Sequence, residues 1–234
     1  MIKRPIVLLQ NISKYYMVGE HKICAIDDVS LSLYQGEMKV LVGNSGSGKS
    51  TLLHLIGCID KPDNGSIFID GFNTDASTLE ELSSLRLNKI GFIFQSFNLI
   101  PVLTAAENVE FPLLFRKNND KRWVAQRIDE VFEKIGLQDR KNHYPRQLSG
   151  GQQQRVAIAR ALIGDPSILI ADEPTANLDS QTSMGILDLI ESIKKEDNLT
   201  VLLASHDSVV LDKIRDKIYI KDGKIIPLGA GFNV

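Results

Sequence analysis

The chain has few cysteines and no long apolar run. Cys24 and Cys58 are its only cysteines among 234 residues. Two thiols cannot build a disulfide framework, so we expect both to pack as ordinary apolar side chains. No apolar stretch approaches the ~20 residues of a membrane-spanning helix, and the stretch 6–9 is too short for a signal peptide. These absences predict a cytoplasmic protein whose membrane role, if any, depends on a partner.

An excess of basic residues is also missing. Lys and Arg number 27 and Asp and Glu 29, which gives a net charge of −2. Proteins that neutralise phosphate backbones usually carry a basic excess, so we expect no nucleic-acid partner. Hydrophobic residues make up 43% and charged residues 24%, a balance that excludes a disordered chain. Repeats, low-complexity tracts and clear linkers are absent, which favours a single domain.

Apolar strand-like runs alternate with segments of helical periodicity. Such alternation predicts a mostly parallel sheet with helices on its faces. From about residue 75 to 165 helical spacing dominates, and we predict an α/β core interrupted by a helical insertion. The predicted strands include 6–9, 26–33, 39–42, 66–69, 90–94, 168–171 and 200–204, and helices are predicted from Ser50, over 122–135, over 155–163 and from Ser180.

A glycine-rich loop follows the predicted strand 39–42. Its sequence GNSGSGKS fits G-x-x-x-x-G-K-[ST] without a mismatch. Such a loop turns successive backbone N–H groups toward a phosphate at a helix N-terminus, its lysine reaches the β- and γ-phosphates, and its serine hydroxyl binds Mg²⁺. An ordinary glycine-rich turn would not match eight positions in this context. The predicted nucleotide-binding residues are Gly43, Asn44, Ser45, Gly46, Ser47, Gly48, Lys49, Ser50 and Thr51.

Two carboxylates, Asp172 and Glu173, follow the buried-type run 168–171. Parallel strands deliver such residues to the sheet edge where ligands bind. Taken alone, an acidic pair after a strand is usually a helix cap or a solvated turn. With the phosphate loop upstream, we expect Asp172 to hold Mg²⁺ through water and Glu173 to polarise a water for attack on the γ-phosphate. The pair favours hydrolysis over mere binding.

A second glycine pair lies at the predicted start of another helix. Leu148, Ser149, Gly150, Gly151 and Gln152 precede the helical segment 155–163. A bare backbone turn at a helix N-terminus suits a phosphate, although simple serine capping is the alternative. One nucleotide rarely needs two cradles. A second chain that presents this cradle to the first chain's nucleotide would explain the redundancy.

Residues 148–152 resemble the signature motif of ABC-type ATPases, which occurs with both phosphate-site motifs in that superfamily. The resemblance covers nearly the whole chain. It implies a P-loop NTPase fold in which a RecA-like core and an N-terminal antiparallel β-subdomain occupy about 1–95 and 165–234. The helical signature subdomain would occupy about 96–164. It also implies an ATP-dependent homodimer in which each ATP lies between one chain's phosphate loop and the other chain's signature.

Four further residues match family positions. Tyr16 resembles the aromatic residue that stacks on adenine, and Gln95 resembles the glutamine that reaches Mg²⁺ and the attacking water. Asp179 resembles the aspartate that crosses the dimer interface, and His206 resembles the histidine that contacts the γ-phosphate. Ala176 stands where many relatives carry glycine, which reduces backbone freedom but leaves Asp179 in place.

Within the superfamily, the chain resembles the macrolide-exporter, lipoprotein-releasing and cell-division ATPases. The resemblance lies in residues 57–62, 91–101, 104–109 and 148–155. It implies ATPase activity coupled to export, or to mechanical work outside the membrane, on a macrolide, peptide or lipoprotein cargo. The partners would be a separate permease, docked beside Gln95 on the cytoplasmic membrane face, and a membrane-fusion-type adaptor. Because the chain stops soon after 224–226, we expect the permease to lie outside this chain, as a separate subunit or as a removed fusion partner.

Other functions stay open at this point. A soluble ABC ATPase of translation or DNA maintenance usually carries two cassettes or a long coiled-coil insertion, and no heptad tract is present here. An importer ATPase subunit often carries a C-terminal regulatory domain, which this sequence lacks. A P-loop small-molecule kinase would not need the signature or His206.

Overall fold

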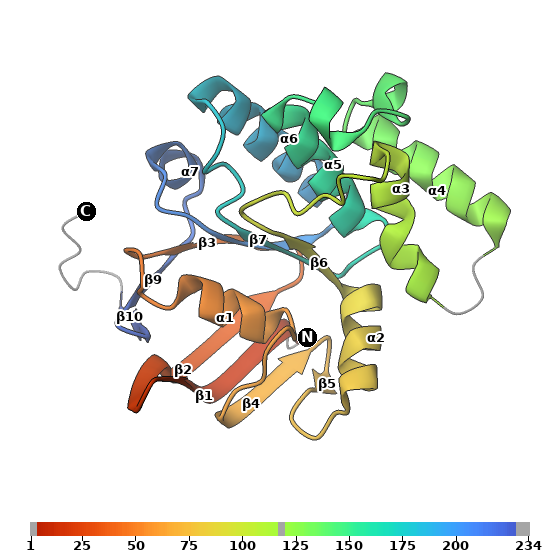
Figure 1. Ribbon diagram of the computed structural model, residues 1–234. Coiled ribbons are helices and arrows are strands. Elements are labelled where there is room, and N and C mark those ends of the chain that lie inside the picture. Colours follow the sequence, from red (N-terminus) through yellow and green to blue (C-terminus); the bar gives the residue numbers. More distant parts are fainter. Residues whose placement is uncertain (1–3, 117–119, 228–234) are drawn as a thin grey trace.

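The computed structural model describes residues 4–116 and 120–227, and its strands form two sheets on either side of α1 (Figure 1). One sheet is antiparallel, with the order β2-β1-β4-β5. Its strands are β1 (Pro5–Val18), β2 (His21–Tyr34), β4 (Asn64–Ile69) and β5 (Phe72–Asn73).

The other sheet has six strands in the order β10-β9-β3-β8-β7-β6. All its neighbours pair in parallel except β10, which is antiparallel to β9. Every residue of β7 and β8 is buried, as expected for strands covered on both faces. The predicted parallel α/β core is therefore confirmed. Its strands are β3 (Met38–Val42), β6 (Ile90–Ile93), β7 (Ile168–Asp172), β8 (Thr200–Ala204), β9 (Lys217–Lys221) and β10 (Lys224–Ile226).

Helix α1 (Lys49–Ile56) joins the two sheets through one apolar core. Leu52, Leu53 and Ile56 are fully buried, in the same cluster as Leu9 of β1 and Ile170 of β7. The helix ends where the sequence predicted, since the N–H of the following glycine donates to the Leu53 carbonyl at 2.7 Å. A continuous apolar surface thus fixes the phosphate loop between the sheets.

The remaining helices cover the opposite face of the six-stranded sheet and its β6 edge (Figure 1). Phe132 and Val156 lie in a second core cluster with sheet residues such as Leu169 and Leu203. Residues 105–162 of this segment are mostly helical, as predicted. The helices are α2 (Leu79–Lys89), α3 (Ala105–Glu110), α4 (Lys121–Lys134), α5 (Gly150–Leu162), α6 (Ser180–Asp197) and α7 (Ser208–Lys213), with 3₁₀ turns η1 (Phe111–Phe115), η2 (Gln138–Arg140) and η3 (Pro145–Gln147).

The β1–β2 hairpin is longer than the predicted strands 6–9 and 26–33. Backbone pairing continues to Val18 and His21, across a turn at Gly19. This part of the hairpin has no buried face, so the apolar pattern that predicts a strand ends early in the sequence. The backbone hydrogen bonds between the two strands nevertheless continue to the turn. Cys24 lies there and is exposed, which corrects the expected packing role. Cys58 is buried as expected.

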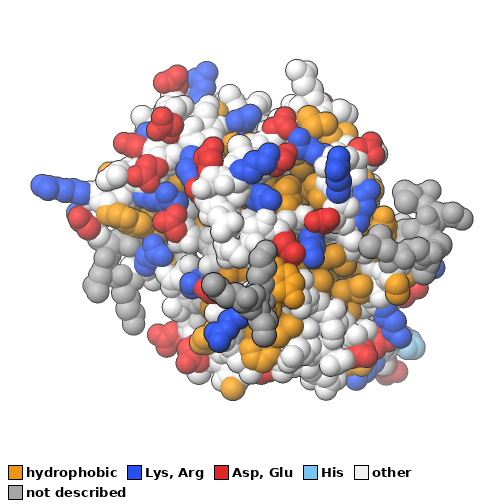
Figure 2. All heavy atoms as spheres, turned by 180° about the vertical axis from the view of Figure 1, so that it is seen from behind, with side chains coloured by type: hydrophobic (Ala, Val, Ile, Leu, Met, Phe, Trp, Pro, Cys, Tyr) orange, Lys and Arg blue, Asp and Glu red, His pale blue; other side chains and the backbone are white. Residues whose placement is uncertain are grey.

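The surface gives no sign of a basic band on the side shown in Figure 2. Lys and Arg side chains are interspersed with Asp and Glu side chains over that face. Within residues 4–116 and 120–227, no helix is both long enough and apolar enough to cross a bilayer.

Asn108 organises the connection between β6 and α3. Its side chain is fully buried, its Oδ1 accepts from the Ile100 N–H at 2.7 Å, and its Nδ2 donates to three carbonyls. Beside it, Thr104 and Glu107 form the predicted capping box. Because its buried side chain bonds to the backbone of Ile100, Leu103 and Thr104 at once, Asn108 fixes the loop that follows β6.

We expect Asn108→Ala to lower the free energy of unfolding by ~2–4 kcal/mol, because the buried hydrogen bonds of its amide to the loop backbone would be lost. Chemical denaturation monitored by circular dichroism measures this change. The control is Asn73→Ala, since Asn73 is exposed and accepts one hydrogen bond from Asp75. Equal stability losses in the two variants would contradict the organising role of Asn108.

Candidate nucleotide site

The phosphate loop lies between β3 and α1, with its lysine folded inward. Lys49 is 7% exposed, and its Nζ donates to the carbonyls of Gly43 at 2.7 Å and Asn44 at 3.2 Å. Gly48 has φ +105°, and a Cβ there would lie 2.6 Å from the Ala25 carbonyl oxygen. The conformation therefore excludes other residues at Gly48. The ammonium group is bound by two backbone carbonyls of the loop.

Glu173 lies at the carboxyl end of β7 and faces this lysine. Its Oε1 is 2.7 Å from His206 Nδ1 and 3.9 Å from Lys49 Nζ, and its side chain is 9% exposed. Glu173 has φ +48°, so the chain turns sharply where the strand ends. The neighbouring strand β8 brings in His206, and the fold thereby unites three predicted site residues that are far apart in sequence.

Asp172 and Ser47 each present a buried oxygen that needs a ligand. Asp172 Oδ1 and Ser47 Oγ have no hydrogen-bond partner among the described residues. Ser50, at the start of α1, is exposed. Mg²⁺ prefers oxygen ligands and usually completes its shell with phosphates and water. The Asp172 carboxylate and the hydroxyls of Ser47 and Ser50 are oxygen donors that fit that ion. In the described part of the chain no group of three or more His, Cys, Asp or Glu residues forms a metal site by itself.

The side chain of Tyr16, on β1, contacts two charged neighbours. Its hydroxyl donates to Asp60 Oδ2 at 2.8 Å, and Lys14 Nζ lies 5.4 Å from the ring centroid. Partial burial and the Asp60 carboxylate raise the pKa of Tyr16 to about 12. The ring keeps 38% exposure. Sequence reasoning missed the role of Asp60, because the residue lies 44 positions from Tyr16 and the segment 57–62 indicated only a family branch.

Gln95 extends from the same sheet edge as Glu173. In the parallel pair β6–β7, Ile93 aligns with Ala171. Gln95 lies two residues after Ile93, and Glu173 lies two residues after Ala171. Strand β6 ends at Ile93 rather than at the predicted residue 94, and Gln95 is exposed in the loop. The adjacent loop holds it, since Asn177 Nδ2 donates to the Gln95 carbonyl at 3.1 Å.

Asp179 caps α6. Its carboxylate accepts from the Thr182 N–H at 2.9 Å and from Thr182 Oγ1 at 2.6 Å, and these hydrogen bonds lower the pKa of Asp179. The side chain is thus held charged in the loop that follows β7. Whether it meets a second chain stays a prediction.

The signature residues form the beginning of α5. Ser149 caps the helix and forms a capping box with Gln152, while Leu148 precedes it. The helix starts at Gly150, five residues earlier than the segment 155–163 predicted from the sequence. The capping box explains the earlier start, because it satisfies the first backbone N–H groups of the helix. A Cβ on Gly151 would lie 2.5 Å from Thr182 Cγ2, so the glycine lets α5 approach α6 closely.

The signature is not joined to the phosphate loop within one chain. Across the described residues, no hydrogen bond or ion pair links 148–152 to 43–51. Lys49, Glu173 and His206 converge, whereas the second glycine pair has no such bond to the phosphate loop.

These features match a known family. The ABC transporter family model matches residues 26–176. The chain belongs to the ABC transporter family. Because its helices and strands are those of an ABC cassette, the P-loop NTPase fold expected from the signature is confirmed.

Among relatives, the chain is 46% identical to the ABC transporter ATP-binding protein MJ0796 of Methanocaldococcus jannaschii, over 94% of both chains. It is 42% identical to the macrolide export ATP-binding/permease protein MacB of Hyphomonas neptunium, over 95% of this chain but 34% of that protein. The solved dimer of MJ0796 bound to ADP and Pi aligns with TM-score 0.85 at 46% identity, over 94% of this chain and 96% of that one.

The ABC cassette is an ATPase, and its cofactors are ATP and Mg²⁺. The relatives support the macrolide-exporter branch. Nothing in these likenesses assigns a role to an individual residue here, so the roles of the site residues stay predictions.

We expect Lys49→Ala to weaken ATP binding by about tenfold to a hundredfold, because a charge-assisted phosphate contact is lost. Titration with a fluorescent ATP analogue measures the Kd. Lys39→Ala is the control, since Lys39 precedes the loop on β3 and pairs with Glu37. Unchanged affinity in a folded Lys49→Ala variant would contradict the assignment of the lysine.

Proposed function

We propose that this chain is the ATP-hydrolysing subunit of an export-type ABC complex, bound to a membrane permease at the cytoplasmic face. The observation that carries the proposal is the convergence of Lys49, Glu173 and His206 at one sheet edge. Similarity to cassettes that are part of macrolide export permeases supports the export branch. ATP-driven closure of two cassettes would move the permease or act mechanically beyond the membrane.

In the proposed site the chain's own groups divide the work. Lys49 binds the β- and γ-phosphates, and Tyr16 offers its exposed ring to adenine. Glu173 accepts a proton from the attacking water, and His206, which contacts the same carboxylate, binds the γ-phosphate. Mg²⁺, held by Ser50, Gln95 and water on Asp172, would neutralise charge on the phosphates.

The second half of the site comes from another copy of the chain. Ser149, Gly150 and Gly151 form a helix N-terminus, which favours an anion. Since no hydrogen bond or ion pair within residues 4–116 and 120–227 joins this end to the chain's own phosphate loop, its nucleotide would be the partner's. The dimeric structures of MJ0796 support such an arrangement. Asp179 would cross the same interface.

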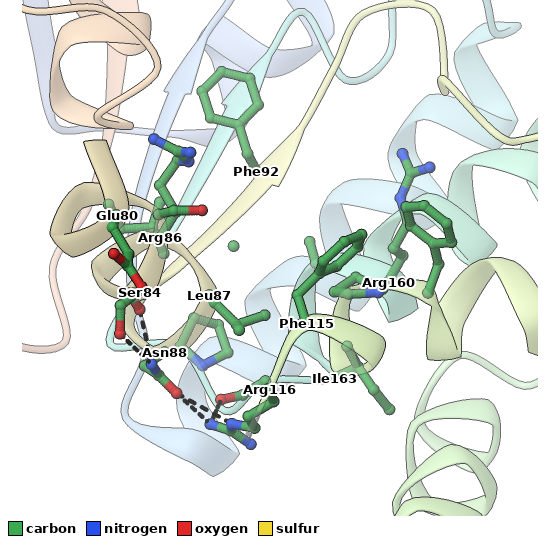
Figure 3. A pocket seen from close by; sticks show the side chains of 18 of the residues that line it. Glu80, Ser84, Arg86, Leu87, Asn88, Phe92, Phe115, Arg116, Arg160 and Ile163 are labelled. Atoms are coloured by element: carbon green, nitrogen blue, oxygen red, sulfur yellow. Dashed lines mark hydrogen bonds between the residues drawn. The ribbon is translucent and has the colours of Figure 1, made fainter. Parts of the chain in front are cut away.

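A groove of about 1340 Å³ beside the Gln95 loop suits the permease (Figure 3). Helix α2 forms one wall, and Phe115, Ile163 and Arg160 lie opposite, while Arg116 hydrogen-bonds Asn88 across one end. The Phe115 side chain is 69% exposed, which is costly without a partner. Because MacB relatives carry a cassette and a permease in one protein, we assign the groove to an apolar cytoplasmic segment of the permease.

We expect Glu173→Gln to retain ATP binding, accumulate as a dimer and lose turnover by about a hundredfold or more, because the proton acceptor is gone. Gel filtration with Mg-ATP and a phosphate-release assay measure both effects. Glu196→Gln is the control, since Glu196 is exposed near the end of α6. A variant that stays monomeric at saturating ATP would contradict the two-chain site.

We expect the tagged chain to capture a polytopic permease with a large extracytoplasmic domain from detergent-solubilised membranes, together with any membrane-fusion-type adaptor. Phe115→Asp should abolish capture, because it places a charge in the apolar groove, whereas Val18→Asp on the exposed hairpin turn should not. Recovery of ribosomal or DNA-associated proteins alone would contradict the transporter function and favour a soluble ABC ATPase.

A further inference from the structure

The loop after Gln95 has an unusual backbone. Phe97 has φ +53° and Asn98 φ +51°, the only adjacent pair of left-handed non-glycine residues in the part of the chain that the structure describes. This conformation brings Cβ close to the backbone, which is unfavourable for a bulky residue such as Phe97 and less so for Asn98. A separate interaction must therefore hold the segment.

Arg160, on the last turn of α5, supplies that interaction. Its Nη2 donates to the Phe97 carbonyl at 2.7 Å and its Nη1 to the Asn98 carbonyl at 2.5 Å. Among the described residues, no carboxylate forms an ion pair with this guanidinium. Burial lowers the pKa of Arg160. Its planar fork binds the two carbonyls of the left-handed pair.

The same loop also contacts the beginning of α5. A Cβ on Gly150 would lie 3.9 Å from Phe97 Cζ and 3.3 Å from Leu178 Cδ2, so the signature glycine, the Gln95 loop and the loop before α6 meet there. Asn177 adds its hydrogen bond to the Gln95 carbonyl. Residues 95–98 are thus held from both ends of the signature helix and from the loop after β7.

We propose that Arg160 is a positioning residue that holds residues 95–98, and so fixes Gln95 at the reacting phosphate and couples it to the signature helix. The inference rests on the proposed hydrolytic role of Gln95. The arginine also lines the permease groove, and in Figure 3 its guanidinium points away from the Asn88 and Arg116 end of that groove. A groove occupant would therefore touch the residue that sets the Gln95 loop.

The test compares Arg160→Ala and Arg160→Lys with the control Arg155→Lys. Arg155 lies on the same helix and donates to the Ile135 carbonyl, away from the Gln95 loop. We expect both Arg160 variants to lose about tenfold or more in kcat for ATP while KM changes by less than about twofold, since the phosphate loop is untouched. Arg155→Lys should keep the wild-type kcat. Melting temperatures show whether each variant is folded.

A second substitution separates positioning from general stability. Glycine adopts the left-handed conformation without penalty, so Asn98→Gly should restore kcat at least severalfold in the Arg160→Ala background. The Asn98 side chain is exposed, which makes the single variant a suitable reference.

Unchanged kcat in both Arg160 variants would overturn the inference, as would a kcat loss that Asn98→Gly does not relieve. If wild-type protein hydrolyses no ATP, the proposed function fails instead. These failures are therefore distinguishable.

Discussion

The contact of Glu173 with both His206 and Lys49 depends on one constraint, the parallel pairing of β3, β8 and β7. Parallel strands end at the same edge, so residues that follow them meet although they lie far apart in sequence. Val40 aligns with Leu203, and Leu169 aligns with Val201. A register slip in this sheet would separate Lys49 from Glu173. The fully buried core opposes such a slip and so supports the site.

The two-chain site that we propose follows from the separation of the phosphate loop from the signature within one chain. The phosphate loop is anchored between the two sheets by α1, while the signature opens α5 on the helical side. Gly151 allows close packing of α5 on α6, whose N-terminus is capped by Asp179. The signature and Asp179 therefore belong to one rigid packing unit. A nucleotide that bridges two copies would contact that unit and the partner's phosphate loop together.

Local motifs were sufficient to predict much of the site. The loop 43–50, the carboxylates after β7 and the serine cap of α5 are all encoded within a few residues, and each lies where its pattern indicated. Contacts between distant segments were not predictable in this way. Asp60 and Arg160 bind Tyr16 and the loop after Gln95 across 44 to 63 residues of sequence. Cys24 shows the converse error, since an apolar neighbourhood does not ensure burial on a solvated hairpin.

Coupling between a membrane partner and ATP chemistry requires an element that both can contact. The loop 95–98 satisfies this requirement, because Gln95 follows β6 at the sheet edge and the carbonyls of Phe97 and Asn98 are bound by an arginine of the groove wall. Two left-handed residues make the loop costly to maintain without that arginine. A loop held by a few replaceable hydrogen bonds can shift between discrete positions, whereas the close-packed core around α1 cannot. Movement at the groove would therefore reach Gln95 before it disturbed Lys49.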